Sequence, residues 1–102
     1  MHTSLTPAHP GEILRTRFPI GMTVTDAAQS LKISRVTLSK VLNARCSVTA
    51  GMALRLAAWL GTPPDFWLEM QIRWDLWQAK QQAIPNIQPL SAREYDGSLE
   101  KP

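Results

Sequence analysis

The sequence predicts an all-α protein with five helices followed by an irregular C-terminal tail. Strand-like alternation of apolar and polar residues is absent up to the tail, and helix-breaking residues recur at intervals of about a dozen positions. The length of 102 residues suffices for one hydrophobic core, and a composition with 44% hydrophobic and 19% charged residues is typical of a folded globular protein. We therefore expect an N-terminal arm over residues 1–8, one domain over 9–83 and a proline-containing tail over 84–102.

The first helix is predicted to begin within the stretch HPGEILRTRF, residues 9–18. His9 is placed to cap it, and Pro10 suits the first helical position. Glu12 lies in the first turn, where the helix dipole favours an anion. The proline and the glycine at positions 19 and 21 end this helix.

Two short helices follow with only a brief interruption between them. Thr23 and Asp26 form a capping-box pattern, which opens a helix that runs to Leu31. Ser34 is placed to cap the next helix, which runs to about Leu42. Two helices joined by a turn of three or four residues form a helix-turn-helix, whose second helix enters the major groove of DNA. This part of the sequence therefore predicts a site for double-stranded DNA.

The second helix of this motif separates into an inner and an outer face. Its inner face is expected to pack through Leu38, Val41 and Leu42. The residues expected to read bases are Arg35, Val36, Thr37, Ser39 and Lys40. The residues expected to contact the DNA backbone are Thr23, Lys32, Ser34, Asn43 and Arg45. Lys32 occupies the turn position that commonly carries a left-handed glycine, where a lysine costs about 1 kcal/mol, so either the turn is tolerated with strain or it has a different shape.

The distribution of charge supports a polyanionic partner for the first part of the chain. Residues 1–60 hold seven Lys or Arg and two Asp or Glu, whereas residues 61–102 hold four and six. Between Lys32 and Arg55 there are five cations and no acid. Such a concentration of one sign of charge favours contact with nucleic acid.

Two further helices are predicted after the helix-turn-helix. Thr49 is placed to cap the fourth helix, AGMALRLAAWL, and Gly61 is expected to close it in a left-handed conformation. Thr62 is predicted to cap the fifth helix, which covers roughly residues 63–83 and has two prolines and Asp65 in its first turn.

The fifth helix carries two apolar stripes. At about 100° per residue, the two sets that share a face are Phe66, Trp67, Met70, Trp74 and Trp77 on one side and Leu68, Ile72 and Leu76 on the other. A helix on the surface of a domain needs only one such stripe for docking. Either this helix is buried all round, or one stripe packs on the domain and the other meets a second copy. The alternating three- and four-residue spacing favours a homodimer interface formed by Trp67, Met70, Trp74 and Trp77.

The sequence does not favour an enzyme, a metal site or a cofactor. It contains no HExxH, no CxxC and no glycine-rich phosphate loop. His2, His9 and Glu12 are better explained by the terminus and the start of the first helix than as a metal cluster. A single cysteine, Cys46, cannot form a disulfide within the chain, and no apolar run approaches the roughly 20 residues of a membrane span. We therefore expect a cytoplasmic protein with no catalytic residue.

The chain resembles the lambda-repressor-like (Xre-type) helix-turn-helix superfamily and, more narrowly, the HigA-type (VapI-like) antitoxins of bacterial toxin–antitoxin modules. The stretches that carry the resemblance are HPGEIL (9–14), ISRVTLSKVLNAR (33–45), VTAGMALRLAAWLGTPPDFWLEMQ (48–71) and WDLWQA (74–79). The resemblance implies a five-helix DNA-binding domain that dimerises through the region after the helix-turn-helix and represses its own operon. It also implies a toxin partner, a small basic RelE-like protein that cleaves mRNA on the ribosome and that the antitoxin neutralises.

The resemblance extends to the predicted DNA contacts. The five base-reading positions match the reading helix of the family, and Thr23, Ser34 and Asn43 match its backbone-contact positions. Two positions depart from the family pattern, because Lys32 and Ala44 stand where glycine is usual. The alternative function is a solitary Xre-type transcriptional repressor without a toxin, and a neighbouring gene for a small basic protein would distinguish the two.

Overall fold

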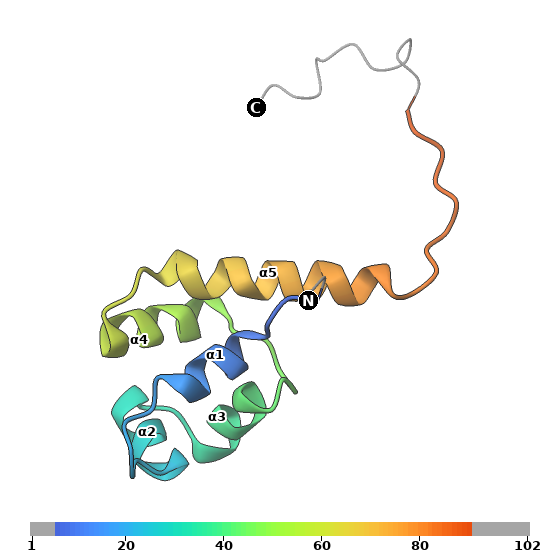
Figure 1. The fold of residues 1–102 in the computed structure, drawn as a ribbon. Coiled ribbons are helices and arrows are strands. Elements are labelled where there is room, and N and C mark those ends of the chain that lie inside the picture. Colours follow the sequence, from blue (N-terminus) through green and yellow to red (C-terminus); the bar gives the residue numbers. More distant parts are fainter. Residues whose placement is uncertain (1–5, 91–102) are drawn as a thin grey trace.

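The computed structural model describes residues 6–90, and this part of the chain forms five α-helices and no β-strand (Figure 1). The helices are α1 (Pro10–Thr16), α2 (Val24–Leu31), α3 (Arg35–Leu42), α4 (Ala50–Leu60) and α5 (Pro64–Lys80). The predicted fold class is therefore confirmed. Of the predicted arm and tail, residues 1–5 and 91–102 lie outside the described residues.

The first four helices begin at the predicted capping residues. The caps are His9 for α1, Thr23 for α2, Ser34 for α3 and Thr49 for α4, and each side chain accepts a hydrogen bond from a backbone amide of the first turn. Thr23 and Asp26 make both bonds of the capping box, at 3.0 and 3.2 Å. These bonds satisfy amides that have no partner within a helix, so short local patterns suffice to set where each helix begins.

The predicted start of α5 is wrong by one residue. Pro63, in an extended conformation, is the N-cap and makes no side-chain capping bond. The physical reason is Pro64, since a proline disfavours the helical conformation in the residue before it. The hydroxyl of Thr62, the predicted cap, instead accepts a hydrogen bond from Nε1 of Trp67 at 2.7 Å. The helix also ends at Lys80 rather than near residue 83.

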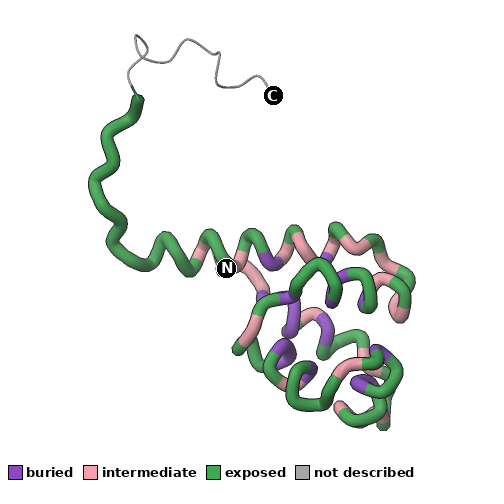
Figure 2. The backbone as a smooth tube through the Cα atoms, turned by 180° about the vertical axis from the view of Figure 1, so that it is seen from behind, coloured by how far each residue is buried: buried purple, intermediate pink, exposed green. Residues whose placement is uncertain are grey.

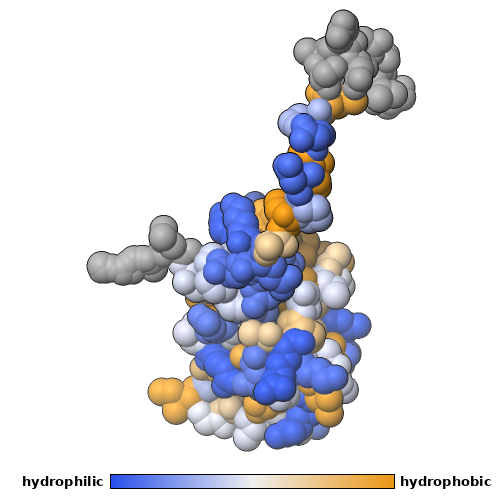
Figure 3. Space-filling view, turned by 90° about the vertical axis from the view of Figure 1, so that its right-hand side faces the viewer, coloured by the Kyte–Doolittle hydropathy of each residue, from blue (hydrophilic) through white to orange (hydrophobic). Residues whose placement is uncertain are grey.

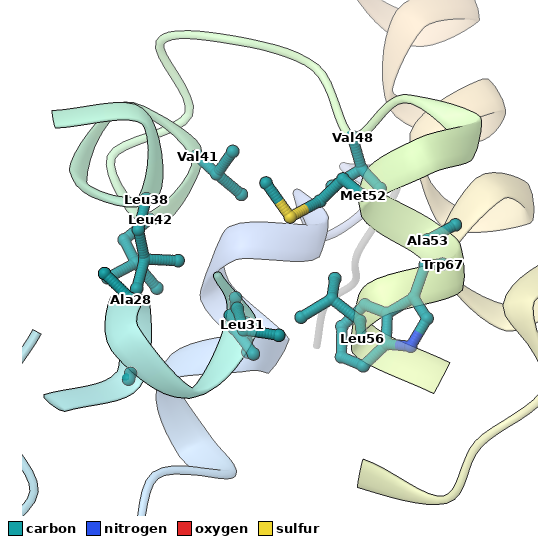
Figure 4. Close-up of a cluster of buried hydrophobic side chains, with 12 residues drawn as sticks. Ala28, Leu31, Leu38, Val41, Leu42, Val48, Met52, Ala53, Leu56 and Trp67 are labelled. Atoms are coloured by element: carbon teal, nitrogen blue, oxygen red, sulfur yellow. The ribbon is translucent and has the colours of Figure 1, made fainter. Parts of the chain in front are cut away.

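All five helices contribute to one hydrophobic core. Its buried members are Leu14, Ala27, Ala28, Leu31, Leu38, Val41, Leu42, Val48, Met52, Ala53, Leu56 and Trp67. Figure 4 shows labelled members from α2, α3 and α4 converging between these helices. Trp67 is 0% exposed, so it has no surface left with which to contact a second copy. Its prediction as a dimer-interface residue is therefore wrong, because its side chain is fully enclosed by its own domain.

The C-terminal half of α5 extends past the other helices (Figure 1), and most of it is exposed (Figure 2). Ile72 and Leu76 are 56% and 55% exposed, which rules out a helix that its own domain buries all round. On the opposite stripe Trp74 is half-buried and packs edge-on against His9, with ring centroids 5.2 Å apart. The stripe that contains the tryptophans thus faces the domain, and the stripe of Ile72 and Leu76 faces outward.

Residues 83–90 continue from α5 without helix or strand, as predicted for the start of the tail. Figure 3 shows hydrophobic and hydrophilic residues alternating along the segment as it leaves the helices. Its exposed apolar side chains are Ile84, Ile87 and Leu90.

Candidate nucleic-acid interface

The turn between α2 and α3 keeps the left-handed conformation, so it is the strained alternative that the structure shows. Lys32 ends α2 with φ 60° and ψ 45°. A residue with a side chain is disfavoured in this conformation by about 1–2 kcal/mol. The turn is closed by the amide of Ile33, which donates to the carbonyl of Ala28 at 3.0 Å. The lysine therefore carries backbone strain at the point where the chain redirects into α3.

Helix α3 presents two different faces. Leu38, Val41 and Leu42 are buried against α1 and α2, as predicted. The side chains of Arg35, Thr37 and Lys40 are exposed, Val36 is 60% exposed and Ser39 is half-buried. The structure thus brings all five predicted base-reading residues to one short helix, with none of them in the core.

The residues predicted to contact the DNA backbone differ in whether their side chains already form hydrogen bonds within the protein. Ser34 Oγ accepts from the amide of Thr37 at 3.0 Å and donates to Thr37 Oγ1 at 2.8 Å. Asn43 Nδ2 donates to the carbonyl of Ser39 at 2.8 Å, and its Oδ1 accepts from Arg15 at 2.8 Å. Both side chains are therefore engaged within the protein.

The cations have greater freedom than these polar residues. Among residues 6–90, no intramolecular hydrogen bond engages the side chains of Lys32, Arg35, Lys40 or Arg45, and all four residues are exposed. A guanidinium or ammonium group without an internal partner can bind an anion at no cost in internal bonds. These four side chains form a positively charged surface over the turn, α3 and the residues that follow it.

The loop after α3 is held by the rest of the domain. Ala44 has φ 58°, so the position where glycine is usual in the family does require the left-handed region. Further along, the amide of Val48 donates to Oε1 of the buried Gln71 at 2.7 Å, and Gln71 Nε2 donates to Asp75 at 2.9 Å. Gln71 was not predicted as important, since a lone glutamine on an otherwise apolar helix face carries no recognisable pattern.

His9 links α1, the loop and α5. It is 1% exposed, its Nδ1 accepts from the amide of Gly11 at 2.9 Å, and its ring contacts Trp74. Burial lowers the pKa of His9 below the ordinary value of 6.5, and this effect outweighs the opposing influence of Glu12, Asp75 and a hydrogen bond with the backbone of Cys46. The neutral ring is the form that can accept the capping bond at Nδ1.

The depressed pKa of His9 predicts a loss of stability in acid. Because the folded pKa lies below the unfolded value, the contribution to stability is complete above the unfolded pKa and is lost as pH falls through the folded pKa. We expect the free energy of unfolding to decrease as pH falls below the ordinary value of 6.5, measured by urea denaturation from neutral to mildly acidic pH. His9→Asn retains a capping side chain but no titrating ring, so its free energy of unfolding should change much less over this range. An equal change in both proteins would contradict the assignment.

Residues 6–90 contain neither a metal-binding cluster nor a membrane-spanning helix. No group of three His, Cys, Asp or Glu side chains between residues 6 and 90 could hold a metal ion. In the same span, no helix combines the length and the apolar character needed to cross a lipid bilayer.

Comparison with known proteins gives consistent matches. Residues 12–66 match the family model described as a helix-turn-helix domain. A curated relative, an uncharacterized HTH-type transcriptional regulator of Haemophilus influenzae, is 38% identical over 90 residues, which cover 81% of this chain and 84% of the relative. Antitoxin HigA-1 of Vibrio cholerae is 36% identical over 93 residues, which cover 86% and 88% of the two chains. Among solved structures, antitoxin GraA in complex with its operator matches with a TM-score of 0.75 and 39% identity, over 90% of this chain and 99% of that chain.

Proposed function

The chain belongs to the HigA/GraA-type antitoxins of the helix-turn-helix family, and on this basis we propose that it binds operator DNA through α3 and the residues on either side of it. The observation that carries the proposal is the exposed face of α3, where the side chains of Arg35 and Lys40 have no hydrogen-bond partner among residues 6–90. The operator complex of GraA, at 39% identity, supports the same use of the motif.

The proposed contacts follow from the chemistry of each side chain. Arg35, at the start of α3, suits a two-bond contact with O6 and N7 of a guanine, and Val36 suits the methyl group of a thymine. Lys32 and Arg45 flank α3 and are assigned to phosphates, which position the protein without reading sequence. Since phosphate contacts release counterions, binding should weaken steeply as salt concentration rises.

We further propose that the protein binds as a homodimer through the C-terminal half of α5. The outward stripe of Ile72 and Leu76 is apolar and more than half exposed. Met70, Trp74 and Trp77 are half-buried on the stripe that faces the domain, so we assign the centre of the contact to Ile72 and Leu76. A dimer would place two α3 helices in successive major grooves about 34 Å apart, on a palindromic operator.

Ile72→Glu is expected to give monomers, because it would place a charge in the centre of the proposed apolar contact. Sedimentation velocity of the variant and the wild type measures this directly. Ile84→Glu is the matched control, since Ile84 is 74% exposed but lies in the tail beyond α5. Ile84→Glu should remain dimeric. A dimer that survives Ile72→Glu would place the contact elsewhere.

The strain at the two left-handed residues predicts separable effects on stability and on DNA binding. Lys32→Gly and Ala44→Gly should each raise the free energy of unfolding by about 0.5–1 kcal/mol, because the relieved strain exceeds the added entropy of the unfolded chain. Only Lys32→Gly removes a proposed phosphate contact, so only this variant should bind operator more weakly. Thermal unfolding and fluorescence anisotropy test the two effects. Unchanged operator affinity in Lys32→Gly would exclude the lysine from the interface.

We propose that the antitoxin neutralises a small RelE-like toxin and represses its own operon. The 36% identity with antitoxin HigA-1 supports this function. The second candidate is a solitary repressor, which the HTH-type regulator of Haemophilus influenzae favours at 38% identity. Footprinting on the DNA upstream of the protein's own gene, with and without the product of the neighbouring gene, tests both. Protection that does not respond to that product would favour the solitary repressor, and no protection would reject both.

A further inference from the structure

Two arginines outside the helix-turn-helix contact the backbone before and at the end of α3. At its entrance, Nη1 of Arg55 from α4 donates to the carbonyl of Leu31 at 2.9 Å and to the carbonyl of Lys32 at 3.3 Å. Leu31 is the last residue of α2, and Lys32 is its C-cap in the turn that leads to α3. Arg55 therefore ties the strained turn to a helix that does not belong to the motif.

At the exit of α3, Arg15 from α1 makes the corresponding contacts. Its Nε donates to the carbonyl of Leu42 at 3.2 Å, and its Nη2 donates to Oδ1 of Asn43 at 2.8 Å. The two donors are different nitrogens of one planar guanidinium group. Asn43 in turn donates to the carbonyl of Ser39 within α3, so the contact extends one turn back into the helix.

These contacts have a clear physical basis. The last carbonyls of a helix have no partner within it and carry partial negative charge. The last turn of α2 contains no basic residue, so Arg55 supplies the cation that its own sequence lacks. Hydrogen bonds from a charged donor are stronger than those between neutral groups.

Both arginines are next to fully buried residues of the core. Leu14, next to Arg15, and Leu56, next to Arg55, are each 0% exposed in the core. Each arginine therefore makes its contacts from a backbone position next to the core. The two contacts oppose a shift of α3, one through the turn before it and the other at its C-terminal end.

We propose that Arg15 and Arg55 are positioning residues for DNA recognition, which set the placement of α3 relative to α1 and α4. Arg15 does so through the C-terminal end of α3, and Arg55 through the end of α2 and the turn that leads to α3. The proposal rests on the proposed DNA-binding function. It separates the cations of this region by role. Arg15 and Arg55 donate to acceptors of the protein itself. Lys32, Arg35, Lys40 and Arg45 instead present their charge to solvent.

Replacement by lysine distinguishes this role from a phosphate contact. At position 15 two nitrogens of the guanidinium group donate to two acceptors, the carbonyl of Leu42 and Oδ1 of Asn43. A single ammonium group cannot reproduce this pair of bonds. Arg15→Lys should therefore lose about tenfold in operator affinity, as much as Arg15→Gln. At position 55 one nitrogen serves both carbonyls, so Arg55→Lys should recover most of the affinity lost in Arg55→Gln. Full affinity in Arg15→Lys would show that only its charge matters and would overturn the proposal for Arg15.

Two controls test whether a loss of operator affinity comes only from lower protein stability or from the loss of a positive charge. Thr49→Ala removes the cap of α4, at a cost of about 1 kcal/mol, without touching α3, and it should retain operator affinity. In the Arg15 variants the loss should be larger for operator than for unrelated DNA. An equal loss on both DNAs, with a salt slope lowered by about one, would identify a phosphate contact instead.

Hydrogen exchange of the α3 amides in the DNA-free protein tests the proposal without operator. Faster exchange is expected in Arg15→Gln and Arg55→Gln, and not in Thr49→Ala. If the wild type fails to bind any DNA at low salt, the proposed function is wrong, whereas the exchange result still decides whether the arginines hold α3. Unchanged exchange in both glutamine variants would overturn the positioning role.

Discussion

Replacing Gly11 with alanine is expected to lower the free energy of unfolding by about 3 kcal/mol or more and to abolish operator binding. A Cβ atom at this position would lie 2.1 Å from the carbonyl oxygen of Val41 and 3.0 Å from Cα of Leu42. Both atoms belong to the backbone of α3, so no side chain can move aside to relieve the clash. The added methyl group would therefore force α1 away from α3, and the contacts of Arg15 with the exit of α3 would be lost.

Gly51→Ala is the matched control for this prediction. Gly51 also lies within a helix, but an added Cβ would meet nothing closer than Thr49 Oγ1 at 3.9 Å. This variant should gain about 0.5–1 kcal/mol, the usual advantage of alanine over glycine in a helix. Urea denaturation at neutral pH compares the two variants. Wild-type stability in Gly11→Ala would mean that α1 and α3 do not approach this closely.

Arg35→Ala should weaken binding to the operator by about 1–3 kcal/mol and relax the sequence preference at one base pair. The expected cause is the loss of a two-bond contact with a guanine, which no neighbouring short side chain can replace. The protein itself should be as stable as the wild type, because Arg35 is exposed and makes no internal hydrogen bond among the described residues. Gel shifts on the operator and on single-base variants measure both effects.

Arg45→Ala provides the comparison within the same surface. Arg45 follows α3 and is assigned to a phosphate, so its loss should weaken operator and unrelated DNA about equally and lower the salt slope by about one. If Arg35→Ala behaves in the same way as Arg45→Ala, Arg35 contacts the backbone and another residue reads the base.

The order of the helices and the starts of four of them could be predicted because the signals are local. A cap such as Thr23 bonds to an amide three residues away, and this contact forms wherever the helix lies in the fold. The left-handed conformation of Gly61 was predictable for the same reason, whereas the sequence left the conformation at Lys32 open. The solvent-exposed face of α3 could be predicted from the helical spacing of Leu38, Val41 and Leu42, because these three residues occupy the opposite face.

The environment of the fifth helix could not be predicted in this way. Trp67 and Ile72 both lie on apolar stripes with helical spacing, but one is fully buried and the other is 56% exposed. Which stripe faces the domain depends on the direction in which the chain leaves Gly61, and Pro64 shifts the start of the helix by one residue. Neither effect appears in the spacing of apolar residues.

The contacts that hold α3 were also outside the reach of the sequence. Arg15 and Asn43 are 28 positions apart, and Arg55 and Leu31 are 24 apart. In the sequence Arg55 is counted with the cations that favour DNA, although in the structure its charge is used on two backbone carbonyls. Pairings over such distances require the fold to be known first.

Local patterns of residues are enough to predict the class of the fold, the capping of the first four helices, the helix-turn-helix and the residues on the outer face of α3. The packing of the helices was needed to find the burial of Trp67, the outward stripe of α5, the close approach at Gly11 and the two arginines before and at the end of α3. The physical reason is range. Backbone conformation and amphipathic period arise from neighbours along the chain, whereas burial and side-chain partnership arise only when distant helices pack together.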